Sequence, residues 1–108
     1  MKTVHISVSE LAIVNNILTE YIPDREVRVF GSRLNGRVKP FSDLDLVIMG
    51  DTSINSSLFG DLREAFSESD IPYKVDIVDW ASTKEYFRKI IDQNNEIIFP
   101  VPNFNLPL

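Results

Sequence analysis

Two β-prone segments joined by a polar loop constrain this chain more than any other stretch. The first segment ends at Gly31-Ser32, and after ten intervening residues the second begins with Asp43, Leu44 and Asp45. Side chains two residues apart on a strand point to the same face, so Asp43 and Asp45 are expected to project together, opposite Leu44. This arrangement predicts a sheet that buries one face and carries carboxylates on the other.

The same stretch contains residue types that can hold a nucleotide. Two carboxylates on one strand face are oxygen ligands of the kind that Mg²⁺ prefers. A glycine-serine turn directly after a strand, here Gly31-Ser32, offers backbone N–H groups and a hydroxyl to a phosphate. Metal ligands beside a phosphate-binding turn predict chemistry on a nucleoside triphosphate.

A third acidic residue, Asp76, lies in a later β-prone segment that covers residues 73–78. Strand alternation puts Asp76 on the face opposite Val75 and Ile77, the same parity that Asp43 and Asp45 show in their own strand. Asp79 is a competing candidate, but it falls on the side of Val75 and Ile77. We therefore predict that Asp76 is the third carboxylate of the site.

Sequence periodicity predicts helices around these strands. Ser7 with Glu10, and Ser82 with Glu85, read as two capping boxes that start the first and third helices. The expected helices cover 7–22, 56–69 and 82–94, and the expected strands cover 26–30, 44–49 and 73–78, to which residues 97–99 could add a short strand. The order α-β-β-α-β-α predicts an α/β (α+β) fold in which helices pack on a β-sheet.

The length of 108 residues suits one domain, which we expect over residues 1–99. A proline-rich apolar tail follows over residues 100–108 and cannot continue a central strand. Its apolar side chains either fold back onto the core or form a surface for a partner. Both alternatives stay open, and the apolar residues in question are Val101, Phe104, Leu106 and Leu108.

Charge and composition exclude several classes of protein. The net charge of −5 argues against a broad nucleic-acid-binding surface and favours a small substrate or a basic protein partner. The absence of cysteine excludes disulfides and zinc-thiolate sites. No signal peptide and no apolar run of membrane-spanning length is recognisable, so no membrane association is expected and a cytoplasmic location is the default expectation.

The spacing Gly31-Ser32, ten residues, Asp43-Leu44-Asp45 resembles the signature of the nucleotidyltransferase superfamily, which includes DNA polymerase beta. The sequence Gly31-Ser32-Arg33-Leu34-Asn35-Gly36 is similar to that of the minimal nucleotidyltransferases of this superfamily, the MNT proteins. The resemblance covers roughly residues 7–99 and implies the nucleotidyltransferase fold, a mixed β-sheet with helices packed on it. One departure is that Leu34-Asn35 stand where family members commonly carry alanine-arginine.

The resemblance implies a set of site residues. Asp43, Asp45 and Asp76 would be the catalytic carboxylates and would hold two Mg²⁺ ions, with Mn²⁺ as an alternative metal. ATP would be the substrate, and Arg33 or Arg37 would supply the charge of the missing motif arginine. The full set implied to bind the nucleotide is Gly31, Ser32, Arg33, Arg37 and Ser42.

The resemblance also implies a function. MNT proteins transfer AMP from ATP to a tyrosine of a partner HEPN-domain ribonuclease toxin, with which they form a hetero-oligomer as antitoxins of type VII toxin–antitoxin systems. Two other classes stay open. One is a binding-only antitoxin that acts by occlusion, which the loss of arginine at Asn35 favours. The other is a small-molecule adenylyltransferase of the aminoglycoside type, although those enzymes usually carry an additional helical domain.

Overall fold

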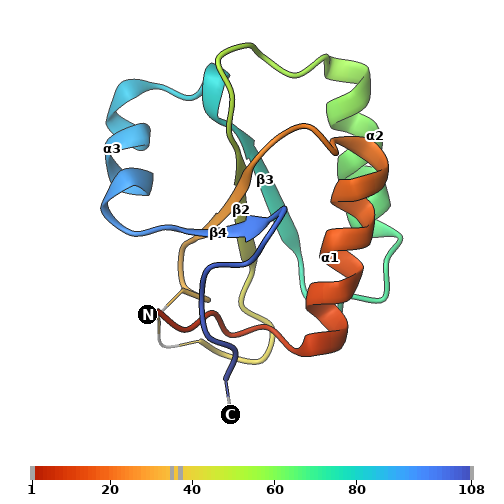
Figure 1. Ribbon diagram of the computed structural model, residues 1–108, viewed down its shortest axis with the longest axis vertical. Helices are drawn as coiled ribbons and strands as arrows, with labels where there is room; N and C mark the ends of the chain where they lie inside the picture. The colour runs from red at the N-terminus through yellow and green to blue at the C-terminus, as the bar shows by residue number, and fades with distance from the viewer. Residues whose placement is uncertain (1, 35, 37, 108) are drawn as a thin grey trace.

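The computed structural model describes residues 2–34, 36 and 38–107, and its centre is a four-stranded sheet. The strands are β1 (Val27–Phe30), β2 (Leu44–Ile48), β3 (Val75–Asp79) and β4 (Glu96–Phe99), in the order β3-β2-β1-β4. β1 is antiparallel to both β2 and β4, whereas β2 and β3 are parallel. The sheet is therefore mixed, as predicted (Figure 1).

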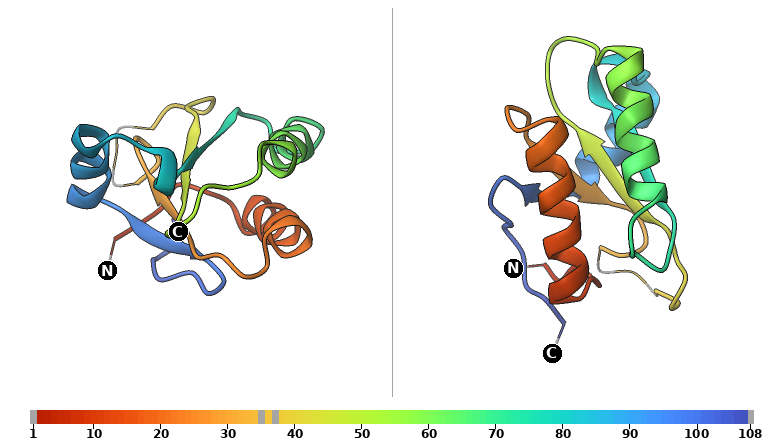
Figure 2. Two further views of the ribbon diagram at one scale, coloured as in Figure 1. Left: turned by 90° about the horizontal axis from the view of Figure 1, so that it is seen from above. Right: turned by 90° about the vertical axis from the view of Figure 1, so that its right-hand side faces the viewer.

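Helices cover both faces of this sheet. α1 (Val8–Tyr21) and α2 (Ser56–Ser67) lie on one face, and α3 (Glu85–Gln93) lies on the other, as the view from above in Figure 2 shows. α1 begins at the predicted capping box, in which Ser7 and Glu10 bond each other's backbone N–H groups. Within the described residues, no helix has both the length and the apolar character needed to cross a membrane.

The two faces of the sheet are packed differently. Leu44, Leu46 and Ile48 of β2 point into the main core against α1 and α2. On the opposite face, Phe30 and Val47 form a smaller cluster with residues of α3. The face predicted to carry carboxylates is therefore polar near the start of β2 and β3, and apolar further along, where α3 covers it.

The predicted start of the third helix was wrong. Residues Trp80–Ser82 form a short 3-10 turn, and α3 begins at Glu85 after Lys84, which makes no side-chain cap. The Ser82 hydroxyl instead donates to Asp79 Oδ2 at 3.0 Å. A hydroxyl held by a buried carboxylate is not available to cap a helix, so the second capping box does not form.

The C-terminal tail folds back along the N-terminal segment. The Asn105 N–H donates to the carbonyl of Lys2 at 2.8 Å, and the Val4 N–H donates to the carbonyl of Asn105 at 3.0 Å. Phe104 and Leu106 pack against the main core, whereas Val101 is 73% exposed. Of the two alternatives for the tail, folding back is the one observed for Phe104 and Leu106; Leu108 lies outside the described residues.

Candidate active site

The parallel pairing of β2 and β3 brings two carboxylates together. Asp45 on β2 lies directly across from Asp76 on β3 in the register of the two strands. Both side chains are on the face away from α1 and α2, because the residues that flank Asp45 point into the main core. Asp43 immediately precedes β2 and is exposed.

Asp45 is the carboxylate of this group whose environment shifts its pKa. Burial raises the pKa of Asp45 to about 6, and the negative charges of Asp76 and Asp43 add to this effect, while Lys74 opposes it. A raised carboxyl pKa means that the site disfavours its own full negative charge. A cation placed beside Asp45 would remove this penalty.

Lys74 already supplies part of that positive charge. Its Nζ lies 3.1 Å from Asp76 Oδ1, and this hydrogen bond raises the pKa of the exposed Lys74 ammonium. Over the ranges 2–34, 36 and 38–107, no group of three acidic, histidine or cysteine side chains is arranged to hold a metal ion. Carboxylate oxygens are nevertheless the ligands that a hard divalent cation prefers. In this structure the Lys74 ammonium provides the positive charge beside Asp76.

Gly31 connects the Gly31-Ser32 turn, which is predicted to bind phosphate, to the carboxylates. It follows β1, whose last residue Phe30 pairs with Asp45, and has a φ of +80°, a conformation that favours glycine. A Cβ added to Gly31 would overlap the Asp45 carboxylate. The Leu34 N–H donates to the Gly31 carbonyl at 3.0 Å and closes the turn, which leaves Ser32 exposed. The Gly31-Ser32 turn therefore lies against Asp45.

Arg33 has contacts different from those expected of a phosphate-binding residue. Only 5% of it is exposed, and its guanidinium lies 3.5 Å over the ring of Tyr73. Its nitrogens donate to three backbone carbonyls, those of His5 at 2.7 Å, Ser42 at 2.8 Å and Pro40 at 2.9 Å. Buried charge must be met by hydrogen bonds, and the carbonyls provide them. Arg33 thus closes the polar loop on itself instead of presenting its charge to the carboxylate face.

Ser42 is also engaged within the loop. Its hydroxyl accepts from the Lys39 N–H at 2.9 Å, and its own N–H donates to the Lys39 carbonyl at 3.0 Å. These bonds form a turn directly before Asp43. Arg37 and Asn35, the other loop positions on which predictions were made, lie outside the described residues.

Tyr73 and Glu10 complete a network that sequence reasoning missed. The Tyr73 hydroxyl donates to Glu10 Oε1 at 2.9 Å, and the same oxygen accepts from the Ser7 N–H at 3.1 Å. Burial raises the pKa of Tyr73, and the hydrogen bond to Glu10 raises it further. The capping box predicted Glu10 as a local helix signal, but nothing in the sequence links it to a tyrosine under Arg33.

Asp79 lies on the buried side, as its parity predicted. It is 8% exposed, and its Oδ2 accepts from the Ile54 N–H at 2.9 Å as well as from Ser82. These bonds tie the end of β3 to the segment before α2. Asp79 is therefore separated from the Asp45–Asp76 pair by the sheet itself.

The fold and the carboxylate pair together define a class of protein. Residues 13–101 match the family described as polymerase beta, nucleotidyltransferase, so the chain belongs to this nucleotidyltransferase family. A relative from Haemophilus influenzae, described as a probable protein adenylyltransferase MntA, is 51% identical over 82 residues, which span 76% of this chain and 72% of the relative. These matches confirm the resemblance seen in the Gly-Ser and Asp-Leu-Asp motifs.

Solved structures support the fold. A toxin–antitoxin structure with AMP-PNP matches with a TM-score of 0.68 and 19% identity, over 82% of this chain and 72% of the other. A tri-AMPylated HEPN toxin from Shewanella oneidensis in complex with its MNT antitoxin matches with a TM-score of 0.62 and 18% identity, over 82% of this chain and 68% of the other. At these identities the likeness concerns the arrangement of helices and strands.

Proposed function

We propose that this chain is an ATP-dependent protein adenylyltransferase that transfers AMP to a tyrosine of a HEPN-domain partner. The observation that carries the proposal is the close approach of Gly31 to the Asp45 carboxylate. The Gly31-Ser32 turn, proposed to bind phosphate, thus lies beside the carboxylates. The relative at 51% identity is described as a probable protein adenylyltransferase. A structural neighbour is an MNT antitoxin bound to an AMPylated HEPN toxin.

Each part of the site has a role in this reaction. The backbone N–H groups of Gly31 and Ser32, with the Ser32 hydroxyl, bind the β- and γ-phosphates of ATP. Asp43, Asp45 and Asp76 are the residues that would hold Mg²⁺, which when bound neutralises the developing charge on the phosphates. Burial, together with the negative charges of Asp76 and Asp43, raises the pKa of Asp45, and a cation bound beside this carboxylate would offset both effects.

The transfer itself is an in-line displacement at the α-phosphorus. The oxygen of the acceptor hydroxyl forms a bond to the α-phosphorus as the bond to the oxygen that bridges to the β-phosphate breaks. Pyrophosphate leaves with that electron pair, and Asp76 accepts the proton of the acceptor. Asp76 is paired with Lys74 in this structure, so this step requires the Asp76 carboxylate to leave the Lys74 ammonium.

A reconstitution tests the proposal. The protein is incubated with ATP, Mg²⁺ and a HEPN-domain protein encoded in the same genome, and the intact mass of the HEPN protein is measured. The expected result is a mass increase of one or more AMP groups, lost in Asp45→Asn and Asp76→Asn and kept in the exposed control Asp51→Asn. An unmodified HEPN protein in the presence of folded wild-type enzyme would refute the proposed activity.

The binding-only antitoxin is a second candidate, and one observation favours it. The Arg33 guanidinium is committed to three carbonyls, so it adds no free charge for the triphosphate. The same experiment separates the two functions. A tight complex that inhibits the HEPN protein without any mass increase would establish occlusion as the mechanism.

A further inference from the structure

β3 leaves one side of its backbone without a neighbouring strand. It stands at the end of the order β3-β2-β1-β4, and among the strands of residues 2–34, 36 and 38–107 it pairs only with β2. The Leu44 N–H donates to the Lys74 carbonyl at 2.9 Å, so the backbone groups of Lys74 face β2. Because successive residues of a strand direct these groups to opposite sides, the N–H and C=O groups of Val75 and Ile77 face the open edge.

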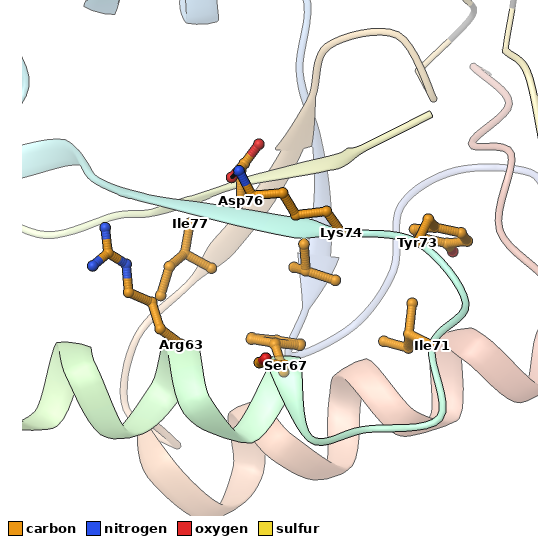
Figure 3. Close-up of a pocket in the computed structure, with 9 residues that line it drawn as sticks. Arg63, Ser67, Ile71, Tyr73, Lys74, Asp76 and Ile77 are labelled. Atoms are coloured by element: carbon orange, nitrogen blue, oxygen red, sulfur yellow. Dashed lines mark ion pairs between the residues drawn. The ribbon is translucent and has the colours of Figure 1, made fainter. Parts of the chain in front are cut away.

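A hollow runs along this edge between β3 and α2. A cavity of about 320 Å³ is lined by apolar Phe66, Ile71 and Ile77, with Arg63 and Lys74 at its rim (Figure 3). A second cavity of about 320 Å³ continues toward Asp79 and Ser82, and Arg63 lines both. Residues 75–77 of β3 therefore border the first cavity, and the second cavity reaches β3 at Asp79.

The positive charge of Arg63 favours an acidic side chain in the two cavities that it lines. Arg63 is exposed on α2, and its guanidinium carbon lies 5.3 Å from the centre of the Phe59 ring. Arg63 forms no ion pair within the described part of the chain. Figure 3 shows its side chain extending from α2 toward the strand. An acidic side chain held in the hollow would meet this guanidinium.

We propose that the protein substrate binds as an extended segment that adds to the edge of β3 as a further strand. This inference rests on the proposed function, because it names how the acceptor reaches the site. Main-chain bonds to Val75 and Ile77 supply affinity that does not depend on sequence, and side chains that alternate between two faces supply specificity. The partner is an extended polypeptide with an acidic residue directed at Arg63.

Strand addition also explains how a tyrosine would reach the reacting phosphate. A residue of the added strand opposite Asp76 would have its Cβ about 5 Å from that of Asp76, on the carboxylate face. Asp45 lies one strand further on, about another 4.8 Å away. A tyrosine side chain is long enough to carry its hydroxyl over Asp76 toward Asp45, whereas a serine hydroxyl would stop short.

The neighbours of that tyrosine would point to the opposite face, into the hollow. There an apolar side chain would contact Phe66 and Ile71, and an acidic one would pair with Arg63. The acceptor sequence is therefore expected to alternate, with the tyrosine flanked directly by apolar and acidic residues.

Amide hydrogen exchange by NMR tests the docking, with the HEPN-domain protein as probe and no ATP present. In the free protein, the amides of Val75 and Ile77 should exchange faster than those of Asp76 and Val78, which donate toward β2. In the complex, the Val75 and Ile77 amides should become protected. A complex in which these two amides keep their free exchange rates would overturn strand addition.

Two variants test the consequence for AMP transfer. Val75→Pro removes an outward N–H and no bond of the β2–β3 ladder, which an edge strand tolerates, and Arg63→Glu reverses the charge in the hollow. Each should lower kcat/KM for the HEPN protein by about tenfold or more while ATP affinity is unchanged. Lys89→Glu, an equal charge reversal at an exposed position of α3, is the control and should have little effect.

The outcomes separate this inference from the proposed function. Normal AMP transfer by folded Val75→Pro and Arg63→Glu, with no amide protection, would overturn strand addition and leave the adenylyltransferase activity in place. If the wild type transfers no AMP, the proposed activity is wrong, and protection of the Val75 and Ile77 amides would still establish the edge as the docking surface. If Val75→Pro does not fold, Arg63→Glu and the exchange data decide.

Discussion

At the scale of single residues, Gly31 is the position where the backbone and the candidate active site constrain each other most directly. Its φ of +80° is accessible to glycine without strain, and the space where a Cβ would lie is taken by the Asp45 carboxylate. Either constraint alone would favour glycine. Together they make this residue a structural requirement of the carboxylate arrangement.

We predict that Gly31→Ala lowers the free energy of unfolding by about 1–3 kcal/mol, because it adds backbone strain and displaces Asp45. The measurement is urea denaturation at neutral pH. Gly60→Ala is a matched control, since Gly60 lies in α2 with open space around it and the change should stabilise the helix by about 0.5–1 kcal/mol. Equal effects of the two changes would show that Asp45 does not approach Gly31.

Asp45 makes the stability of the protein depend on pH. Its pKa is raised from 3.8 to about 6 in the folded state, so folding favours the protonated carboxyl. The stabilisation is complete below the pKa of the unfolded chain and is lost as the pH rises through about 6. Without metal, the wild type should therefore lose stability from about pH 4 to pH 7 relative to Asp45→Asn.

The expected loss is about 1 kcal/mol, a value reduced because the half-buried carboxylate is partly screened by solvent. Urea unfolding of both proteins at a series of pH values measures it. The comparison removes the pH dependence that arises from all other groups. Parallel stability profiles for the two proteins would contradict the raised pKa of Asp45.

At the scale of elements, the loop between β1 and β2 is held by segments that are distant in sequence. Arg33 links this loop to the N-terminal segment through the His5 carbonyl, and it stacks on Tyr73 just before β3. Tyr73 in turn bonds Glu10 at the start of α1. The turn that carries Gly31 and Ser32 is thereby positioned by both ends of the network.

Arg33→Lys should destabilise the protein by about 2–3 kcal/mol, because a single ammonium cannot reach three carbonyls and would be left partly unpaired in a buried position. Thermal or urea unfolding measures the change. Arg28→Lys is the control, since Arg28 forms a partly exposed ion pair with Glu26 whose loss costs about 0–1 kcal/mol. A small effect at Arg33, equal to that at Arg28, would mean that the carbonyl contacts contribute little.

The C-terminal tail is connected to the loop between β1 and β2 through the N-terminal segment. Asn105 pairs with the backbone of Lys2 and Val4, and Val4 in turn forms a bridge with Leu34. Residues of the tail, the N-terminus and the loop are therefore stacked side by side at one end of the molecule. Loss of packing in the tail is expected to affect the loop as well as the core.

Phe104→Ala should lower the free energy of unfolding by about 1–3 kcal/mol, because Phe104 packs against the main core and is partly buried. The change is measured by denaturation. Val101→Ala, at an exposed position of the same tail, should alter stability by less than about 0.5 kcal/mol. If both variants unfold like the wild type, the tail does not pack on the core in solution.

At the scale of the whole molecule, the sheet separates two environments. One face is closed by α1 and α2 over the main core, and the other is closed by α3 at one end only. The carboxylates lie on the part of the second face that α3 leaves uncovered. A cation bound there would stabilise the native state as a whole, because the unfolded chain does not assemble these ligands.

We predict that Mg²⁺ raises the melting temperature of the wild type at neutral pH. This increase in melting temperature should become smaller below about pH 6, because protons then compete with the metal for the Asp45 carboxylate. It should be absent in Asp45→Asn and retained in Asp51→Asn. Differential scanning calorimetry with and without Mg²⁺ measures the shift, and an undiminished shift in Asp45→Asn would remove Asp45 from the metal site.

Local patterns were sufficient to predict most of the helices and strands, and also the face of the sheet that carries Asp45 and Asp76. The capping box at Ser7 and the parity of Asp45 and Asp76 depend on residues close in sequence, and the structure has them as predicted. The Gly-Ser turn and the Asp-Leu-Asp motif were recognised from spacing alone. Such features can be predicted from the sequence because alternation along a strand and capping at a helix end depend on neighbouring residues.

The tertiary structure decided what distant segments do to one another. Ser82 bonds buried Asp79 instead of capping α3, and Arg33 binds carbonyls of the N-terminal segment and its own loop instead of remaining free for phosphate. The place of β3 at an open edge follows from strand order. A side chain that can make several hydrogen bonds takes the partners that burial brings to it, and those partners are known only once the chain has folded.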